Sequence, residues 1–324
     1  MKFAGLIAIA AAHNIASEVE NQYLAHIAEH GKSYGTVEEY EARLAIFAKN
    51  VQYIEVHNAV TESEGVHAHK VGINHMADWT EMEYSKIRGY KKRVNHVKNY
   101  VNATEGVEVA TAVDWRANGA VTPPKNQGQC GSCWSFSTTG SLEGRYQIAG
   151  NTLTSFSEQQ FIDCSGSFGN KACQGGLMDD AFKYAEGVKI MTEASYPYEG
   201  KLGTCRAQGG VTTIKSYADV KMNSPSELKA AVATGPVSVA IDAAGIGFQL
   251  YYGGIMKHFC GTSLDHGVLV VGYGTSDSNE DYWILKNSWG GSWGEKGFFR
   301  IFRDDATEGP GVCGLQESAS YPIV

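Results

Sequence analysis

The distribution of cysteine constrains this chain more than any other feature. Seven cysteines occur, all between residues 130 and 313, and seven thiols cannot all pair within one chain. The first third of the chain instead holds eight of the ten histidines. We therefore expect two regions of different chemistry, which suits 324 residues because a folded unit typically takes about 150.

Charge and hydropathy exclude two classes of protein. The formal net charge is −8, which argues against nucleic acid as the main partner. No apolar run approaches the ~18 residues needed to cross a bilayer. Met1-Lys2 and the apolar run over residues 3–12 predict a secretory signal ending near residue 16, with a buried helix as the alternative interpretation. Export also suits the cysteines, since disulfides persist in oxidising compartments.

The N-terminal third is predicted to be helical and to end in a linker. Apolar residues recur at steps of three and four from residue 17 to about 60, and Gly31 and Gly35 divide this pattern into two helices. The segment 89–106 is polar and has no period, so we expect an exposed linker with a solvated basic cluster. Asn102, in Asn-Ala-Thr, is a glycosylation candidate.

The rest of the chain is predicted to form a helix followed by strands. A helix is expected from Ser132 or Cys133 to Ile148. Four short runs rich in Val, Ile, Tyr and Phe predict strands of a twisted antiparallel sheet or barrel: Val237–Ile241, His266–Val271, Tyr282–Lys286 and Gly297–Phe302. Helices first and strands later is an α+β order.

Three separated motifs carry the chemistry. Cys130-Gly131-Ser132-Cys133-Trp134 is followed 133 residues after Cys133 by His266, in Leu-Asp-His-Gly, and after 154 residues by Asn287, in Lys-Asn-Ser-Trp-Gly. On these motifs the chain resembles a papain-family cysteine protease precursor, with cathepsin L-like members most similar. Other shared segments are Ser157-Glu158-Gln159, Cys173-Gln174-Gly175-Gly176-Leu177-Met178 and Tyr196-Pro197-Tyr198.

The resemblance implies a division of the chain. It predicts a signal peptide over 1–16, an inhibitory propeptide over 17–111 and a peptidase domain over 112–324. The expected fold is α+β, with a helical left lobe, an antiparallel β-barrel-like right lobe and a helical propeptide lying in reverse through the cleft. The propeptide motif falls on Glu39, Arg43, Phe47, Asn50, Ile54 and Asn58. A second motif, Gly72-x-Asn74-x-Met76-x-Asp78, has Met at its usual aromatic position.

The same resemblance assigns roles at the cleft. Thiolate is the form that attacks a peptide carbonyl, and a helix N-terminus beside an imidazolium stabilises it. We expect Cys133 and His266 to form this ion pair, Asn287 to accept from the other ring nitrogen, and Trp289 to shield that hydrogen bond. Gln127 would donate to the developing oxyanion. The reaction would pass through an acyl-enzyme.

Substrate contacts and disulfides follow from the family as well. The predicted substrate-binding residues are Gly175, Gly176, Leu177, Met178, Ala240, Leu264, Asp265, Gly267, Trp289 and Ser318. The main selectivity pocket among them has no acid at Ser318, so Leu, Phe or Val is expected there in preference to Arg. Six cysteines allow 15 pairings; the resemblance selects Cys130–Cys173, Cys164–Cys205 and Cys260–Cys313.

The expected protein is a monomeric endopeptidase that needs no cofactor or metal, since no His lies at ligand spacing from a cysteine pair. Its partners would be protein and peptide substrates and its own propeptide, in a lysosome, an acidic vacuole or outside the cell. The propeptide histidines could release it in acid, or could be surface residues with no such role.

Two other functions use the same residues. A thiol-disulfide oxidoreductase would use Cys130 and Cys133 as a redox pair, but the surrounding pattern is not thioredoxin-like. A catalytically silent binding or storage protein is the second, although such relatives usually lose the nucleophile or the base.

Overall fold

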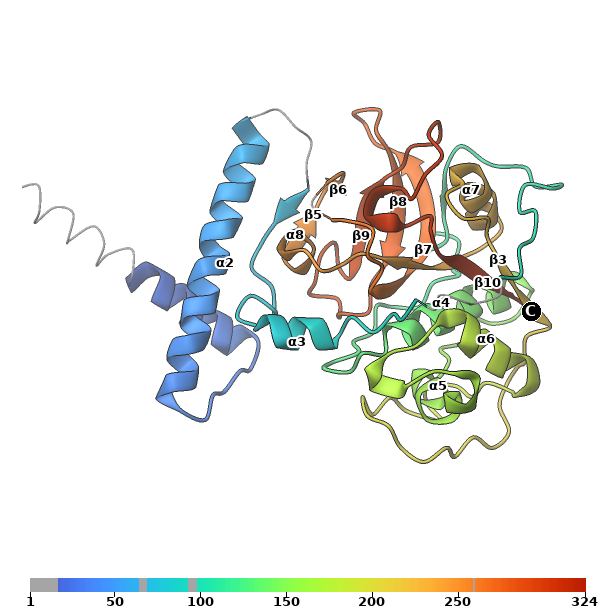
Figure 1. Ribbon diagram of the computed structural model, residues 1–324, viewed down its shortest axis with the longest axis horizontal. Helices are drawn as coiled ribbons and strands as arrows, with labels where there is room; N and C mark the ends of the chain where they lie inside the picture. The colour runs from blue at the N-terminus through green and yellow to red at the C-terminus, as the bar shows by residue number, and fades with distance from the viewer. Residues whose placement is uncertain (1–16, 64–68, 93–97, 259) are drawn as a thin grey trace, which may run out of the picture.

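The N-terminal region of the chain forms a helical unit set apart from the rest (Figure 1). The computed structural model describes residues 17–63, 69–92, 98–258 and 260–324, so the predicted signal segment lies outside it. Residues 17–29 are helical and α2 spans Val37–Ser63, with the chain turning between them at Gly31, where φ is +60°. The division that the glycines predicted is confirmed. Tyr23, Phe47 and Val51 form a small core between the two helices.

A short helix links this unit to the remaining chain. Helix α3 spans Glu81–Lys86 and starts with a capping box, in which Thr80 and Glu83 exchange hydrogen bonds. Before it, β1 (Lys70–Val71) pairs with β5 (Tyr251–Gly253), which belongs to the C-terminal part. The N-terminal unit is therefore joined to the C-terminal domain by this strand pair.

The first half of the C-terminal domain is helical. Its central element is α4, Cys133–Ile148, whose first twelve residues are all buried. Around it lie α5 (Glu158–Cys164), α6 (Met178–Gly187) and two single turns, η1 (Gly166–Phe168) and η2 (Ala172–Gln174). Phe156, Phe161 and Phe182 are among the side chains that fill this lobe's core.

The second half contains an eight-stranded sheet. The strand order is β3-β10-β4-β7-β8-β9-β6, with β2 on β7, and the pairs are antiparallel except β6 with β9. The strands are β2 (Val113–Asp114), β3 (Ser216–Asp219), β4 (Val237–Ile241), β6 (Ile255–Met256), β7 (His266–Thr275), β8 (Asp281–Lys286), β9 (Phe298–Phe302) and β10 (Ala319–Ile323). The remaining helices are α7 (Pro225–Ala233), α8 (Ile246–Gln249) and the turn η3 (Val312–Gly314). The α+β prediction is confirmed, and the sheet is open instead of closed into a barrel.

Helix α4 packs closely on strand β7 and so fixes the two lobes relative to each other. A Cβ atom on Gly140 would lie 2.7 Å from the terminal methyl group of Leu269, so a larger residue there would force that side chain to move. The hydroxyl of Ser137 donates to the carbonyl of Val268 at 2.7 Å, and Ser238 donates to Ser137 O at 2.8 Å. Because Cys133 begins α4 and His266 begins β7, this packing sets where both side chains lie.

Most described residues of 89–106 are exposed, as predicted for a linker, but several side chains in it are bound to the C-terminal domain, which the prediction did not include. Tyr90 and Ala103 are buried and the side chain of Lys98 is 19% exposed. The segment has no helical or strand period because its backbone pairs with the C-terminal domain and its side chains enter separate sites there. Asn102 remains exposed. Among the described residues, no helix is long and apolar enough to cross a membrane.

Candidate active site

Cys133 is buried beneath the N-terminal region. It is the one free cysteine among the described residues and is fully buried. Its Sγ atom accepts the backbone N–H of Gly89 at 3.2 Å and that of Gly267 at 3.3 Å. These donors favour a thiolate, but burial outweighs them and raises the pKa of Cys133 to about 11. Burial beneath the N-terminal region thus opposes ionisation of this thiol.

His266 is oriented by Asn287. Its Nε2–H donates to Asn287 Oδ1 at 2.8 Å, and Oδ1 also accepts the N–H of Ser288, so the oxygen of the amide faces the ring. This places the proton on Nε2 and leaves a lone pair on Nδ1, which has no hydrogen-bond partner among the described residues. The indole of Trp289 stacks on the imidazole with ring centroids 4.7 Å apart. Burial lowers the pKa of His266 to about 4, although the bond to Asn287 opposes it.

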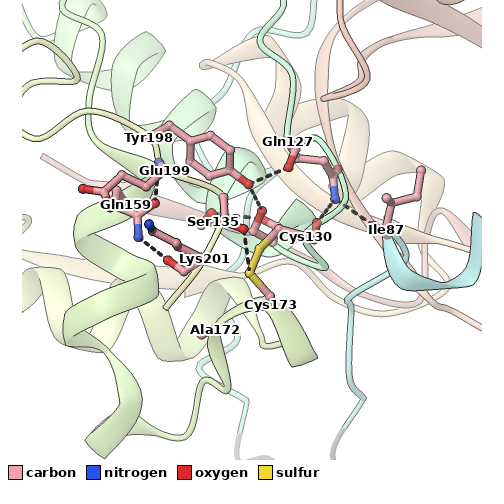
Figure 2. Close-up of a disulfide and its surroundings, with 12 residues drawn as sticks. Ile87, Gln127, Cys130, Ser135, Gln159, Ala172, Cys173, Tyr198, Glu199 and Lys201 are labelled. Atoms are coloured by element: carbon pink, nitrogen blue, oxygen red, sulfur yellow. Dashed lines mark hydrogen bonds between the residues drawn. A yellow bond between two sulfur atoms is a disulfide. The ribbon is translucent and has the colours of Figure 1, made fainter. Parts of the chain in front are cut away.

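The side chain of Gln127 donates into the cleft (Figure 2). Its Oε1 accepts the hydroxyl of Ser288 at 2.6 Å, which fixes the amide so that Nε2 points the other way. Nε2 donates to the carbonyl of Cys130 at 2.7 Å and to the carbonyl of Ile87, in the N-terminal region, at 2.8 Å. The carbonyl oxygen of Ile87 therefore binds the Gln127 amide, the group predicted to donate to the oxyanion.

The segment after α3 runs through the cleft bound to both walls. Gly89 O accepts the N–H of Gly176 at 2.8 Å, Gly176 O accepts that of Lys91 at 3.1 Å, and the bridge is parallel. The opposite wall accepts the N–H of Tyr90 at Asp265 O, 2.9 Å away. A Cβ atom on Gly89 would lie 1.8 Å from the carbonyl oxygen of Gly131, so any side chain there would clash.

Tyr90 fills the predicted selectivity pocket. Its ring belongs to the same buried cluster as Leu177, Met178 and Ala240, with Leu264 packed against it. Its hydroxyl donates to the Oγ of Ser318 at 2.9 Å. The pocket thus has apolar walls and one hydroxyl, and it accepts a whole tyrosine side chain.

The end of α3 covers the side of the site where His266 and Trp289 lie. Arg88 forms ion pairs with Asp265 at 2.8 Å and with Glu81 at 2.9 Å, and its guanidinium lies 4.2 Å from the centre of the Tyr84 ring. The hydroxyl of Tyr84 donates to Ala243 O at 2.5 Å, and its ring meets Trp289 edge-on. The indole that covers His266 is therefore itself covered.

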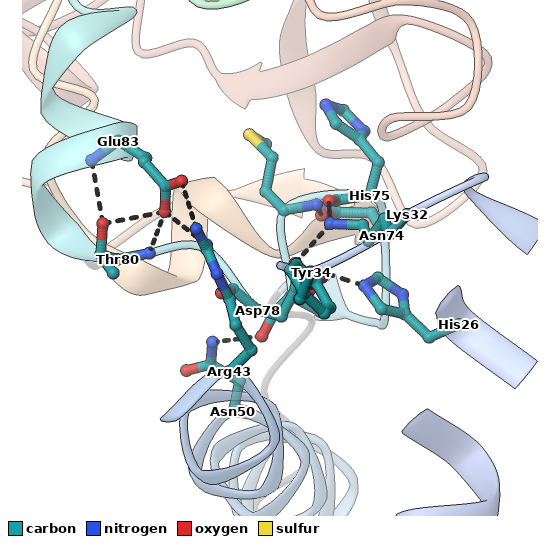
Figure 3. A network of polar contacts seen from close by, with 12 residues as sticks. His26, Lys32, Tyr34, Arg43, Asn50, Asn74, His75, Asp78, Thr80 and Glu83 are labelled. Carbon is teal, nitrogen blue, oxygen red and sulfur yellow. Dashed lines mark hydrogen bonds and ion pairs between the residues drawn. The ribbon is translucent and has the colours of Figure 1, made fainter. Parts of the chain in front are cut away.

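The predicted stripe on α2 secures the loop that leads to α3 (Figure 3). Arg43 binds both carboxylate oxygens of Glu83, at 2.6 and 2.7 Å, and contacts Glu39 at 3.4 Å. Asn50 donates to Ala77 O at 2.7 Å, and Asn58 both donates to and accepts from Val71. Phe47 and Ile54 on the same face are packed in the small core.

The second predicted motif ends in a buried carboxylate. Lys32 and Tyr34 both bind Asp78, and His26 lies 3.4 Å from it. Burial alone would raise the pKa of Asp78, but these hydrogen bonds outweigh it and hold that pKa well below its usual range. Met76 is fully buried in the core of the C-terminal domain. It thus takes the buried position where an aromatic residue was expected.

The remaining predicted residues lie as follows. The disulfides are Cys130–Cys173, Cys164–Cys205 and Cys260–Cys313, the same pairs that the resemblance implied. Gly175 and Gly267 line the cleft: a Cβ on Gly175 would lie 2.5 Å from Gly89 O, and one on Gly267 would lie 3.3 Å from the backbone of Trp134. Among the described residues, no group of His, Cys, Asp and Glu is arranged to hold a metal ion.

Two charged clusters were not predicted. Lys125 bridges the buried carboxylates of Glu143 and Glu158 at 2.8 and 2.6 Å, between the lobes, with Lys286 beyond Thr122. Lys98 binds Asp179 and Asp219 at 2.8 and 2.9 Å. Acids and bases far apart in sequence carry no local pattern, so only Lys286, a charged residue at the end of an apolar run, could have indicated the first cluster.

Comparisons with known proteins agree with this geometry. The model of the papain family of cysteine proteases matches residues 109–323, and that of the cathepsin propeptide inhibitor domain matches residues 23–84. A probable cysteine protease, RD21B, of Arabidopsis thaliana is 46% identical over 95% of this chain and 67% of its own length. A cathepsin L-like peptidase of Aedes aegypti is 41% identical over 98% of both chains.

Solved structures of precursors are similar as well. Digestive procathepsin L 3 from the larval midgut of Tenebrio molitor is 42% identical and superposes with a TM-score of 0.85 over 94% of this chain and 99% of its own. Recombinant stem bromelain precursor gives a TM-score of 0.85 at 34% identity, over 95% of this chain and 99% of its own.

Proposed function

The chain belongs to the papain family of cysteine proteases and carries that family's inhibitory propeptide, and we propose from this premise that it is the zymogen of an endopeptidase that degrades proteins in an acidic compartment. We further propose residues 17–111 as the removable propeptide and 112–324 as the mature enzyme. The observation that carries the proposal is the contact of Gly89 with Cys133, because an assembled site covered by its own chain is what a zymogen requires.

The propeptide is held in a form that Cys133 cannot cleave. Attack requires a carbonyl carbon at the sulfur and the carbonyl oxygen at the oxyanion donors. Here an N–H group faces the sulfur, and the carbonyl at Gln127 belongs to Ile87, two residues earlier. We infer that a substrate runs in the opposite direction to this segment and so presents its carbonyl to Cys133.

Removal of the propeptide would ionise the pair. Once water reaches the cleft, the burial that disfavours both charged forms is relieved, and the thiol proton moves to the free Nδ1 of His266. The thiolate then attacks the carbonyl carbon and His266 protonates the leaving amine. Water, deprotonated by His266, finally cleaves the thioester and releases the acid. Asn287 keeps the ring aligned throughout.

Tyr90 indicates the preferred substrate. The aromatic ring of Tyr90 packs among apolar side chains in the main pocket, and its hydroxyl binds the uncharged Ser318. We propose that Phe, Leu and Val are preferred at the second position before the scissile bond, and that Tyr is accepted through Ser318. A buried guanidinium without a partner would be disfavoured.

Expression of the full chain tests the proposal. Incubation at acid pH should shorten the wild type and release activity on a peptide with Phe at the second position, whereas the Cys133→Ala precursor should keep its length. A wild-type chain that loses its propeptide to an added protease and still cleaves no peptide would instead support a binding or storage protein.

A further inference from the structure

The propeptide has a second contact site on the peptidase domain, outside the cleft, at an edge of the sheet. Strand β3 is the end strand of the order given above, and residues 99–101 lie along it. The N–H of Asp219 donates to Asn99 O at 2.8 Å, and the N–H of Val101 donates to Asp219 O at 3.2 Å. The side chain of Asn99 also donates to Tyr217 O at 2.7 Å. The segment thus pairs with the edge of the peptidase sheet through one parallel bridge, between Tyr100 and Asp219.

Lys98 places its charge beside this edge. Its ammonium binds Asp179, at the start of α6, and Asp219, at the end of β3. The side chain of Asp219 is fully buried and that of Asp179 is 6% exposed. Burial and the neighbouring Asp179 raise the pKa of Asp219, and Lys98 opposes this rise. Two buried carboxylates this close together are stabilised by a shared cation.

The acidic pair is held in place by the peptidase domain itself. The hydroxyl of Ser320, on β10, donates to Asp179 Oδ1 at 2.5 Å, and strand β10 pairs with β3 over Asp219. The backbone N–H of Asn99, from the propeptide, donates to the remaining oxygen of Asp219 at 2.5 Å. A peptide on this edge therefore receives backbone pairing and an ion pair together.

This second contact site lies near the substrate cleft. Asp179 directly follows Met178, which lines the pocket that holds Tyr90, and Lys98 follows Tyr90 by eight positions. Strands β3 and β10 lie beside α6, at the end of the molecule away from α2 (Figure 1). A substrate that runs opposite to the propeptide would direct its N-terminal residues toward this end.

We propose that, after the propeptide leaves, the edge of β3 with Asp179 and Asp219 is a second peptide-binding site for a segment of a protein substrate that carries Lys or Arg, N-terminal to the cleaved bond. The inference rests on the proposed protease function. Pairing with a free strand edge supplies affinity that does not depend on sequence, and the acidic pair selects the basic residue. The side chain of Tyr100 is exposed, so we expect this edge to accept different residues at that position.

Peptides of two lengths test this site. The short substrate spans three residues on each side of the cleaved bond, with Phe at the second position. The long ones extend it at the N-terminus with a flexible spacer and Asn-Lys, so that the lysine lies eight to ten residues before the Phe; matched peptides carry norleucine there. We expect the lysine to lower KM about tenfold with kcat unchanged, the effect of one charge-assisted hydrogen bond.

Variants locate the effect. Asp219→Asn and Asp179→Asn should remove the advantage of lysine over norleucine, and Asp277→Asn, on an exposed turn of the same domain, should retain it. If the wild-type enzyme cleaves the short peptide and handles lysine and norleucine extensions alike, the second site is refuted while the protease function stands. If the processed enzyme cleaves no peptide at all, the proposed function fails first. Because the peptides alone vary in the first comparison, misfolding of a variant cannot decide the result.

Discussion

Gly89, in the segment that we propose as propeptide, donates its backbone N–H to the sulfur of Cys133 at 3.2 Å. The same residue hydrogen-bonds through its carbonyl to Gly176, and it has no room for a side chain against Gly131. One glycine therefore sets both the depth and the direction in which the propeptide crosses the cleft.

Gly89→Ala should open the cleft of the precursor. The added Cβ would lie 1.8 Å from a backbone oxygen that cannot move without displacing α4, so the segment must leave its place. We expect Cys133 to be alkylated on the order of a hundredfold faster in this precursor at pH 7, equivalent to a few kcal/mol of lost contact. The control is Gly35→Ala, where a Cβ meets nothing within 4 Å; equal alkylation rates in the two variants would contradict the role of Gly89.

Gln127→Ala should slow catalysis more than it weakens substrate binding. Its Nε2 is aimed at the carbonyl site by the Ser288 hydroxyl, so its loss removes a donor from the transition state. We expect kcat of the activated enzyme to fall about 10²- to 10³-fold with KM little changed. Exposed Gln129→Ala, two residues away, serves as the control. A Gln127 variant with wild-type kcat would exclude the oxyanion role.

Acid should loosen the propeptide through buried histidines. Burial lowers the pKa of His69 to about 4, with His57 adding to the effect. It also lowers the pKa of His75 to about 4, with His30 and Lys32 adding and Asp78 opposing. An unfolded histidine binds its proton near pH 6.5. Stability contributed by these groups is therefore present above about pH 6.5 and is lost as the pH falls toward 4.

Urea unfolding of the Cys133→Ala precursor, which lacks the proposed nucleophile, measures this loss. The free energy of unfolding of the propeptide should fall by a few kcal/mol between pH 7 and pH 4. His75→Phe should reduce the fall. Asp78, whose pKa is held low, retains its contacts throughout that range. His26, His57 and His69 are buried, so the alternative that the histidines are surface groups does not hold for these three. A free energy of unfolding that does not change between pH 7 and pH 4 would exclude a switching role for His69 and His75.

The charged cluster between the lobes should matter for stability. Lys125→Met would leave Glu143 and Glu158 buried without the cation that bridges them. Removing one partner of a buried ion pair costs about 3–5 kcal/mol, so thermal unfolding should occur well below that of the wild type. Exposed Lys171→Met should leave the unfolding temperature unchanged. Unfolding of Lys125→Met at the wild-type temperature would show that the cluster is dispensable.

A peptide panel tests the pocket that Tyr90 fills. The activated enzyme should cleave peptides with Phe, Leu or Val at the second position at least about tenfold faster, in kcat/KM, than the matched Arg peptide, because burial of an unpaired guanidinium is costly. Ser318→Glu should narrow this ratio by supplying a carboxylate where the tyrosine hydroxyl now binds. Equal rates for Arg and Phe in the wild type would contradict the assignment.

The sequence predicted those parts of the structure that depend on local pattern. The helical period with Gly31 and Gly35 predicted two helices, and the apolar runs predicted β4, β8 and β9 to within one residue, whereas β7 continues four residues beyond the predicted Val271, to Thr275. The residues around Cys133, His266 and Asn287 predicted a site because each lies within a distinctive motif.

Contacts between segments that are distant in the sequence could not be predicted from such local patterns. The polar sequence around Tyr90 and Lys98 shows no helical or strand period. The side chain of Tyr90 enters a pocket, whereas that of Lys98 binds two acids on separate elements. The raised pKa of Cys133 could not be predicted from the motif either, because it arises from burial beneath a segment some forty residues away. The ion pair expected from the motif belongs to the open enzyme that we propose.

The central claim is that Cys133 is a nucleophile covered by its own propeptide. Labelling with an epoxide-type thiol inactivator, followed by mass mapping, tests it most directly, with the activated enzyme labelled at pH 5.5 and the precursor at neutral pH. The account predicts that the activated enzyme is labelled at Cys133 alone and that the freshly purified precursor at neutral pH is not labelled. Labelling of both Cys130 and Cys133, or equal labelling of the precursor and the activated enzyme, would contradict it.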